Sequence, residues 1–121
     1  MKEKFIHIDE YDTKRHYSDR KMEILHREDG PAVVHANGYK AWFINGKRHR
    51  EDGPAVEYPN GDKSWYINGK RHREDGPAID DVNGYKEWFI NGKFLTEEEF
   101  NARMNPVELT LDEIAEKFGV T

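Results

Sequence analysis

Three copies of the segment "HREDGPA" hold the side chains of this sequence that are best suited to chemistry. They begin at His26, His49 and His72, so each histidine recurs 23 residues after the one before. Imidazoles and carboxylates are common ligands of zinc and related metals. One hypothesis is therefore a metal-dependent enzyme in which the repeated histidines bind metal together with the repeated acids. These acids are Glu28, Glu51, Glu74, Asp29, Asp52 and Asp75.

The spacing of the three copies favours a structural role instead. A metal site needs three or four ligands that converge on one point, whereas a fixed-period repeat produces equivalent, separated copies. In the structural interpretation the histidine packs at a corner, the Asp caps the turn made by Gly-Pro, and the Arg pairs with the Glu. No glycine-rich phosphate loop or nucleophile elbow occurs in the sequence. We therefore predict a protein that is not an enzyme and needs no cofactor.

The segment belongs to a longer repeat, in which fifteen of 23 positions are identical in all three copies. Self-similarity at a fixed period is typical of architectures whose stacked units share one continuous core. We expect residues 1–25 to form a degenerate N-terminal cap and residues 95–121 to form an acidic helical segment. The three repeat units between them are residues 26–48, 49–71 and 72–94.

Turn signals within each unit predict its strands. The first unit has Asn-Gly at Asn37-Gly38 and again at Asn45-Gly46, and this dipeptide favours type I′ hairpin turns because both of its residues accept positive φ. The run between the turns, Tyr39–Ile44, is rich in strand-forming residues. The corner proline cannot donate a ladder hydrogen bond. The fold class expected is mainly β, an elongated antiparallel meander of three repeats with a short C-terminal helical cap.

Side chains alternate across a strand, which sorts the repeated positions into faces. We expect one buried stripe of apolar residues that recur in every unit, and solvent exposure at the positions that differ between units. The expected stripe is Trp42, Ile44, Trp65, Ile67, Trp88, Ile90, Val33, Val56 and Ile79. The variable positions are Val34/Glu57/Asp80, His35/Tyr58/Asp81 and Ala41/Ser64/Glu87. The row Phe43, Tyr66 and Phe89 is either a second buried row or an exposed aromatic ridge.

The two ends of the chain depart from the repeat. The segment Lys4–Ile8 is expected to be a strand of the N-terminal cap. Thr96 and Glu99 form a capping box for a helix over Glu97–Met104, which Asn105-Pro106 interrupts. A second helix is expected where apolar residues follow at i, i+3, i+4 and i+7. Its residues are Thr110 and Glu113 as capping box, then Leu111, Ile114, Ala115 and Phe118.

Composition and charge restrict the class of protein further. The 121 residues include no cysteine, and the net charge of −5 comes from the C-terminal segment. No broad basic surface for nucleic acid is apparent in the sequence. No apolar run approaches the roughly 20 residues that a membrane helix needs, and the first ten residues are too charged for a secretory signal. We expect a cytoplasmic protein of one domain.

Basic clusters at Lys47–Arg50 and Lys70–Arg73 leave two interpretations open. Clustered bases attract phosphate and anionic lipid. Each cluster, however, is followed at once by Glu-Asp, so the local charge nearly cancels. A row of ion pairs between successive units is the favoured interpretation.

The repeat resembles the MORN family, whose units of about 23 residues are β-hairpins built from glycine turns, aromatic residues and an "NGK.H" stretch. The matching stretches are Asn45–His49 and Asn68–His72, and the likeness covers residues 26–94. The sequence departs from the family where "HREDGPA" stands in place of closely spaced glycines. This variety is similar to repeats in accessory proteins of bacteriophages and large DNA viruses. The resemblance implies a β-hairpin fold and a scaffolding role.

The C-terminal stretch 109–121 also resembles the first helix and turn of a helix-turn-helix, as in bacterial sigma factors. Base readout depends on a second helix, which would start where the sequence given stops. A packed terminal helix is the favoured interpretation, and mimicry of a sigma-factor helix stays an alternative.

The preferred functional hypothesis is a binding module that displays variable and aromatic side chains to a protein partner. The viral resemblance implies that this partner is a host protein that is inhibited or redirected. The alternative is a structural protein in which sheet edges join copies into a homo-oligomer. The candidate partner-binding residues are Glu57, Tyr58, Asp80, Asp81, Glu87, Phe43, Tyr66 and Phe89.

Overall fold

The computed structural model describes residues 4–106 and residue 112. Within these residues the chain is mainly β, with antiparallel strands followed by one short helix, which confirms the fold class predicted from the sequence. The N-terminal elements are β1 (Phe5–Ile8), β2 (Lys14–Tyr17), β3 (Val33–Val34), β4 (Lys40–Ala41), β5 (Phe43–Ile44) and β6 (Lys47–Arg48). The others are β7 (Val56–Glu57), β8 (Lys63–Ser64), β9 (Tyr66–Ile67), β10 (Lys70–Arg71), β11 (Ile79–Asp80), β12 (Lys86–Ile90), β13 (Lys93–Leu95) and α1 (Glu97–Met104).

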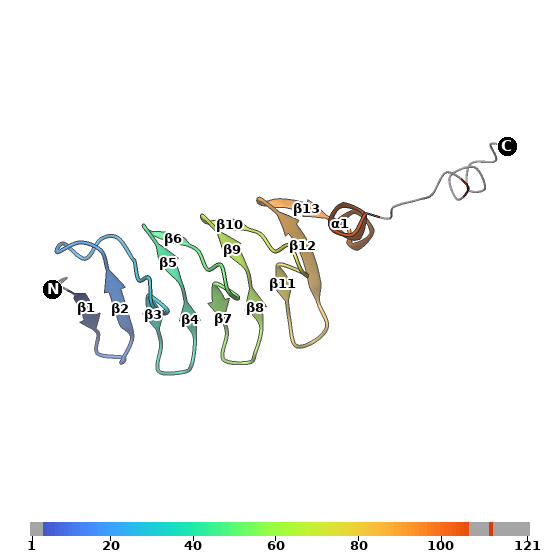
Figure 1. Cartoon of the computed structure of the whole chain (residues 1–121). Helices are drawn as coiled ribbons and strands as arrows, with labels where there is room; N and C mark the ends of the chain where they lie inside the picture. The colour runs from blue at the N-terminus through green and yellow to red at the C-terminus, as the bar shows by residue number, and fades with distance from the viewer. Residues whose placement is uncertain (1–3, 107–111, 113–121) are drawn as a thin grey trace.

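The strands form a long meander that advances in one direction from β1 to α1 (Figure 1). Its main sheet has nine strands in the order β1-β2-β3-β4-β7-β8-β11-β12-β13. The pairs β5–β6 and β9–β10 form two-stranded sheets at the side. The β3–β4, β7–β8 and β11–β12 loops lie along one long edge, which we call the tip edge (Figure 1).

The two Asn-Gly turns of each unit differ in the structure. At Asn45-Gly46 both residues have positive φ, 51° and 78°, as the predicted type I′ turn requires. At Asn37-Gly38 only Gly38 does, with φ 100°, so the type I′ prediction is wrong there. His35 N–H donates to the Tyr39 carbonyl, which leaves three residues in the loop instead of two. A type I turn followed by a left-handed glycine is the usual solution for that length.

Hydrogen bonds from the tryptophan backbone join each unit to the next. Trp42 N–H donates to the Ala55 carbonyl at 2.8 Å, and Trp65 N–H to the Ala78 carbonyl at 2.8 Å. The carbonyl of each tryptophan accepts instead from the histidine that follows β6 or β10, so the chain changes partner at this residue, and β4 and β5 are separate strands, as are β8 and β9. The third unit has no following "HREDGPA" corner, and there β12 runs unbroken through Trp88.

Small residues make the core of this thin sheet. Ala32, Ala55 and Ala78 of the corners have no exposed surface. In the register Val33, Val56 and Ile79 are cross-strand neighbours of the variable positions Ala41, Ser64 and Glu87. These six residues share one face of the sheet, and the tryptophans lie on the other. Two sequence predictions are corrected by this. The apolar residues do not form one stripe, and Ala41 and Ser64 are buried instead of solvent-facing.

The helix α1 ends the sheet as predicted. It spans Glu97–Met104, begins at the Thr96–Glu99 capping box and is followed by Asn105 as C-cap. Its Phe100 is 3% exposed and packs with Ile90 and Leu95. The second predicted helix and the sigma-factor-like stretch lie outside the described residues. Within residues 4–106, no helix is long and apolar enough to cross a membrane.

Residues 4–25 supply β1, as predicted, and β2, which together resemble a reduced unit. His16 occupies the place of a tryptophan here, since its N–H donates to the Ala32 carbonyl at 2.7 Å. Burial is the main cause that lowers the pKa of His16, and the positive charges of Arg27 and Lys14 lower it further. The first unit is thus stacked on a degenerate one.

Candidate functional site

The repeated "HREDGPA" segments form corners whose charged groups are engaged locally. In the central corner His49 Nδ1 accepts a hydrogen bond from Asn68 N–H of the next turn at 3.0 Å. Its Nε2 lies 3.5 Å from a Glu51 carboxylate oxygen. Arg50 donates to Asp52 at 3.0 Å and to the Pro54 carbonyl at 3.0 Å. Equivalent contacts occur in the other two corners.

These contacts support the structural interpretation and correct its details. The arginine pairs with the aspartate instead of the glutamate, which faces the histidine. The aspartate binds this arginine, and in the first corner the Arg27 hydrogen bond is the main cause that lowers the pKa of Asp29. Among the described residues, no three His, Asp or Glu side chains come close enough together to hold a metal ion.

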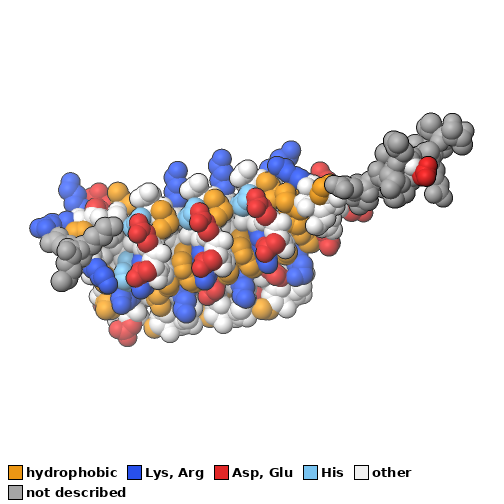
Figure 2. All heavy atoms as spheres, in the orientation of Figure 1, with side chains coloured by type: hydrophobic (Ala, Val, Ile, Leu, Met, Phe, Trp, Pro, Cys, Tyr) orange, Lys and Arg blue, Asp and Glu red, His pale blue; other side chains and the backbone are white. Residues whose placement is uncertain are grey.

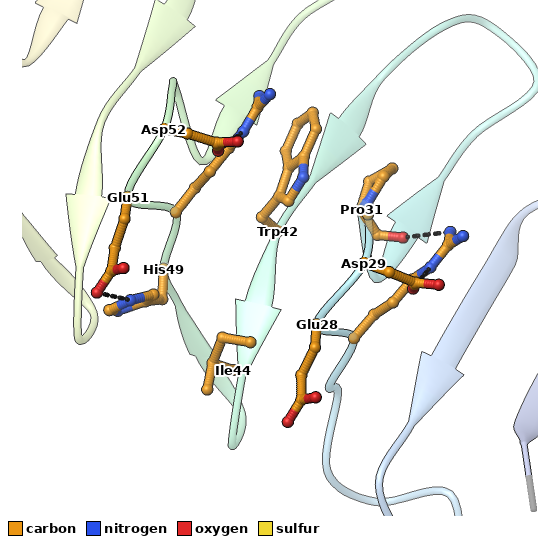
Figure 3. A pocket seen from close by; sticks show the side chains of 11 residues that line it. Glu28, Asp29, Pro31, Trp42, Ile44, His49, Glu51 and Asp52 are labelled. Atoms are coloured by element: carbon orange, nitrogen blue, oxygen red, sulfur yellow. Dashed lines mark hydrogen bonds and ion pairs between the residues drawn. The ribbon is translucent and has the colours of Figure 1, made fainter. Parts of the chain in front are cut away.

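We call the side of the sheet that bears the corners and tryptophans the corner face. Arg50 stacks over the Trp42 ring with its guanidinium carbon 3.9 Å from the ring centroid, and Arg73 does the same over Trp65 at 3.8 Å. A groove of about 730 Å³ lies beside Trp42, between two successive corners (Figure 3). Carboxylates repeat along this face in register with the histidines (Figure 2).

The opposite side carries an alternating stack of rings and arginines. Arg48 lies 5.9 Å from the Phe43 centroid and 5.5 Å from that of Tyr66. Arg71 lies 5.9 Å from Tyr66 and 5.4 Å from Phe89 in the same way. Each arginine therefore bridges the aromatic residues of two successive units. Cation–π contacts of this kind orient guanidinium groups while their edges stay available for hydrogen bonds.

Tyrosines extend this stack towards the tip edge. Tyr39 and Tyr58 meet edge to face with centroids 5.5 Å apart. Tyr58 is 43% exposed and Tyr85 is 51% exposed, so their rings reach solvent. Beyond β12, Phe94 packs against Phe89 at 5.7 Å and is 55% exposed. We call this side the aromatic–arginine face. Its residues are Tyr39, Phe43, Arg48, Tyr58, Tyr66, Arg71, Tyr85, Phe89 and Phe94.

Two carboxylates lie close together where this face reaches the tip edge. An Asp62 oxygen accepts a hydrogen bond from Val82 N–H at 2.9 Å, which joins the second unit to the third. Partial desolvation raises the pKa of Asp81, and the neighbouring charges of Asp62 and Asp80 raise it further. A carboxylate held beside like charges gains from a cation supplied by a partner.

The structure divides the eight candidate residues between the two faces. In the register Glu57 and Asp80 lie opposite lysines of adjacent strands. Each of these lysines precedes a tryptophan by two residues and therefore shares its face, which is the corner face. There Glu57 lies 3.4 Å from Arg50, and Asp80 lies 2.7 Å from Lys86. The six on the aromatic–arginine face are Tyr58, Asp81, Glu87, Phe43, Tyr66 and Phe89. Strand alternation places them there, because Tyr58 and Asp81 follow Val56 and Ile79 by two residues.

Two of these six are less exposed than expected. Glu87 is half-buried beside Ile79, and its carboxylate accepts a hydrogen bond from the Tyr85 hydroxyl. Tyr66 is half-buried between the two arginines. The open question about the Phe43 row is therefore answered by a half-buried row whose rings alternate with arginines.

Sequence reasoning missed Arg48 and Arg71. It assigned them to basic clusters that form ion pairs between units, whereas in the structure they stack on rings. The sequence signal for this contact is the type I′ turn at Asn45-Gly46, because a two-residue turn places Phe43 directly opposite Arg48. The other arginines of these clusters, Arg50 and Arg73, form ion pairs within their own corners.

No protein-family model matches the chain, no curated protein matches it, and no solved structure matches it.

Proposed function

We propose that this chain is a non-enzymatic module that binds a protein partner through its aromatic–arginine face. The observation that carries the proposal is the stack in which Arg48 and Arg71 alternate with Phe43, Tyr66 and Phe89. Aromatic residues and arginine are the types most enriched where protein interfaces are strongest. The stack holds them in place before binding, which reduces the entropy lost on association.

The charges on this face favour a protein over a nucleic acid. Guanidinium groups stand in the middle of the face, whereas Asp62 and Asp81 stand at the tip edge. A polyanion would gain from the arginines but be repelled by the two carboxylates, while a protein can supply both signs of charge. The likeness to viral MORN-like repeats adds a host protein as the proposed partner.

Adjacent residues on opposite faces allow a matched test. Tagged wild-type chain, Asp81→Lys and Asp80→Lys would each be incubated with a lysate of the cells in which the protein naturally acts. A partner should be captured by the wild type and by Asp80→Lys. Asp81→Lys should bind it about tenfold more weakly, because the introduced lysine would then face a cationic group of the partner. Equal capture by both variants, or loss only with Asp80→Lys, would contradict the assignment of the face.

A further inference from the structure

The two end strands of the nine-stranded sheet, β1 and β13, have different surroundings. At one end α1 follows β13 (Figure 1). It packs against β12 and β13, and its Phe100 is buried among Ile90 and Leu95. At the other end β1 is the outermost strand, and β2 is its only neighbour within the described residues. An uncovered edge strand presents a row of backbone donors and acceptors that another strand can pair with.

The outward groups of β1 can be identified from the ladder. Asp9 N–H donates to the Thr13 carbonyl at 3.1 Å, so Asp9 and Thr13 are a hydrogen-bonded pair. Such pairs alternate along an antiparallel ladder, which makes His7 and Phe5 the next two that bond to β2. The amide and carbonyl groups of Ile6 and Ile8 therefore point away from the sheet.

We propose that β1 pairs antiparallel with β1 of a second copy of this chain, joining two sheets into one. Only outward-facing residues can form hydrogen-bonded pairs across the new ladder. A register centred on His7 satisfies this condition, because it sets Ile6 of each chain opposite Ile8 of the other. Ile8, which is 59% exposed, is covered by this pairing.

Charge complementarity selects the same register. With His7 on the two-fold axis, Lys4 of each chain approaches the β1–β2 turn of the other, in which Glu10 follows Asp9. Lys4 and Glu10 are both exposed in the single chain. The Ile6–Ile8 pairs are apolar cross-strand pairs of the kind that stabilise antiparallel ladders, and opposite charges near both ends of the contact favour the same alignment.

The different finish of the two ends sets the size of the assembly. A β1–β1 contact uses the same surface on both chains, so it has two-fold symmetry and closes after two copies. Further growth would need pairing at β13, where α1 is packed. The structure therefore predicts a dimer and no filament. The aromatic–arginine face lies along the sheet and not at this edge, so a dimer would present two such faces.

Sedimentation equilibrium over a range of concentrations tests the proposal, with Ile8→Lys and Phe94→Lys as matched variants. These two apolar residues have similar exposure, 59% and 55%, and lie at opposite ends of the sheet. We expect a dimer for the wild type and for Phe94→Lys, and a monomer for Ile8→Lys with an unchanged circular dichroism spectrum. A wild type that stays monomeric, an Ile8→Lys variant that dimerises, or growth beyond two copies would overturn the proposal.

A charge exchange tests the register separately and does not depend on a lysine at the edge. Lys4→Glu and Glu10→Lys should each weaken the dimer, because each places like charges across the contact. The double variant should regain the wild-type dissociation constant. A double variant that dimerises no better than either single one would overturn the proposed register.

Discussion

The corner face and the aromatic–arginine face use arginine in opposite ways. On the corner face Arg50 is bound by Asp52 and the Pro54 carbonyl, and its guanidinium also covers Trp42 of the preceding unit. On the other face the Arg48 guanidinium lies between two rings, and it donates no hydrogen bond to a side chain among the described residues. The corner residues are identical in all three units, whereas Tyr58 and Asp81 occupy positions that differ between them. We infer that the corner residues stack the units and that the aromatic–arginine face, where Tyr58 and Asp81 differ between units, recognises a partner.

The largest effect on stability is expected at Trp65, the tryptophan of the central unit. Trp65→Ala removes the ring under Arg73 and should lower the free energy of unfolding by about 2–4 kcal/mol. Tyr58→Ala, on the other face, should cost less than about 1 kcal/mol because the ring is partly exposed. Urea denaturation followed by tyrosine and tryptophan fluorescence measures both. The reverse order would mean that recognition and stacking are not divided between the faces.

A smaller effect is expected where a turn depends on glycine. Gly69 has φ 78° in a type I′ turn, so Gly69→Ala should destabilise the chain by about 1–2 kcal/mol. Gly53 lies in a corner without positive φ, and a Cβ there would meet only the far end of the Arg50 side chain, whose guanidinium carbon would lie at 2.9 Å. Gly53→Ala should therefore cost less, as thermal denaturation would show. A greater loss at Gly53 would mean that the corner arginine cannot move.

The degenerate N-terminal unit should respond to acid. Burial lowers the pKa of His16, so the folded chain resists a proton that the unfolded chain accepts. Its contribution to stability is complete above about pH 6.5 and is lost as the pH falls below that value. His16→Phe should flatten the dependence of the unfolding free energy on pH across this range. Parallel curves for the variant and the wild type would exclude His16 as the cause.

The smallest effect is expected at the exposed corner carboxylates. Glu51 is 83% exposed at its side chain and lies 3.5 Å from His49. Exposed pairs of this kind contribute about 0–1 kcal/mol, so Glu51→Gln should leave both the denaturation midpoint and partner binding nearly unchanged. Loss of binding in this variant would make the corner face a recognition surface and reverse the comparison.

The fold could be predicted because local signals in the repeat agree with one another. Asn45-Gly46 specified a type I′ turn, and Thr96 with Glu99 specified the start of α1. The faces were harder to assign. Trp42 was grouped with Val33 because both positions are apolar in every unit, but Val33 lies opposite Ala41, so alternation places Trp42 on the other face. Which residues lie opposite each other on two strands cannot be read from the spacing along one strand.

The candidate site was predicted only in part for the same reason. Aromatic residues at Phe43, Tyr66 and Phe89 could be singled out from their recurrence, but their arginine neighbours could not. Arg48 was assigned to the charged run that follows it in sequence, whereas in space it belongs to Phe43 and Tyr66. The face of each acid depended on register, which separated Asp80 from Asp81.

Site-directed photo-crosslinking tests the central claim most directly. The chain has no cysteine, so Tyr58→Cys and Glu57→Cys would each carry one photoreactive label on neighbouring residues of opposite faces. Our account predicts that the label at position 58 crosslinks to the captured partner, while the label at position 57 does not. Efficient crosslinking from position 57 and none from position 58 would contradict the assignment of recognition to the aromatic–arginine face.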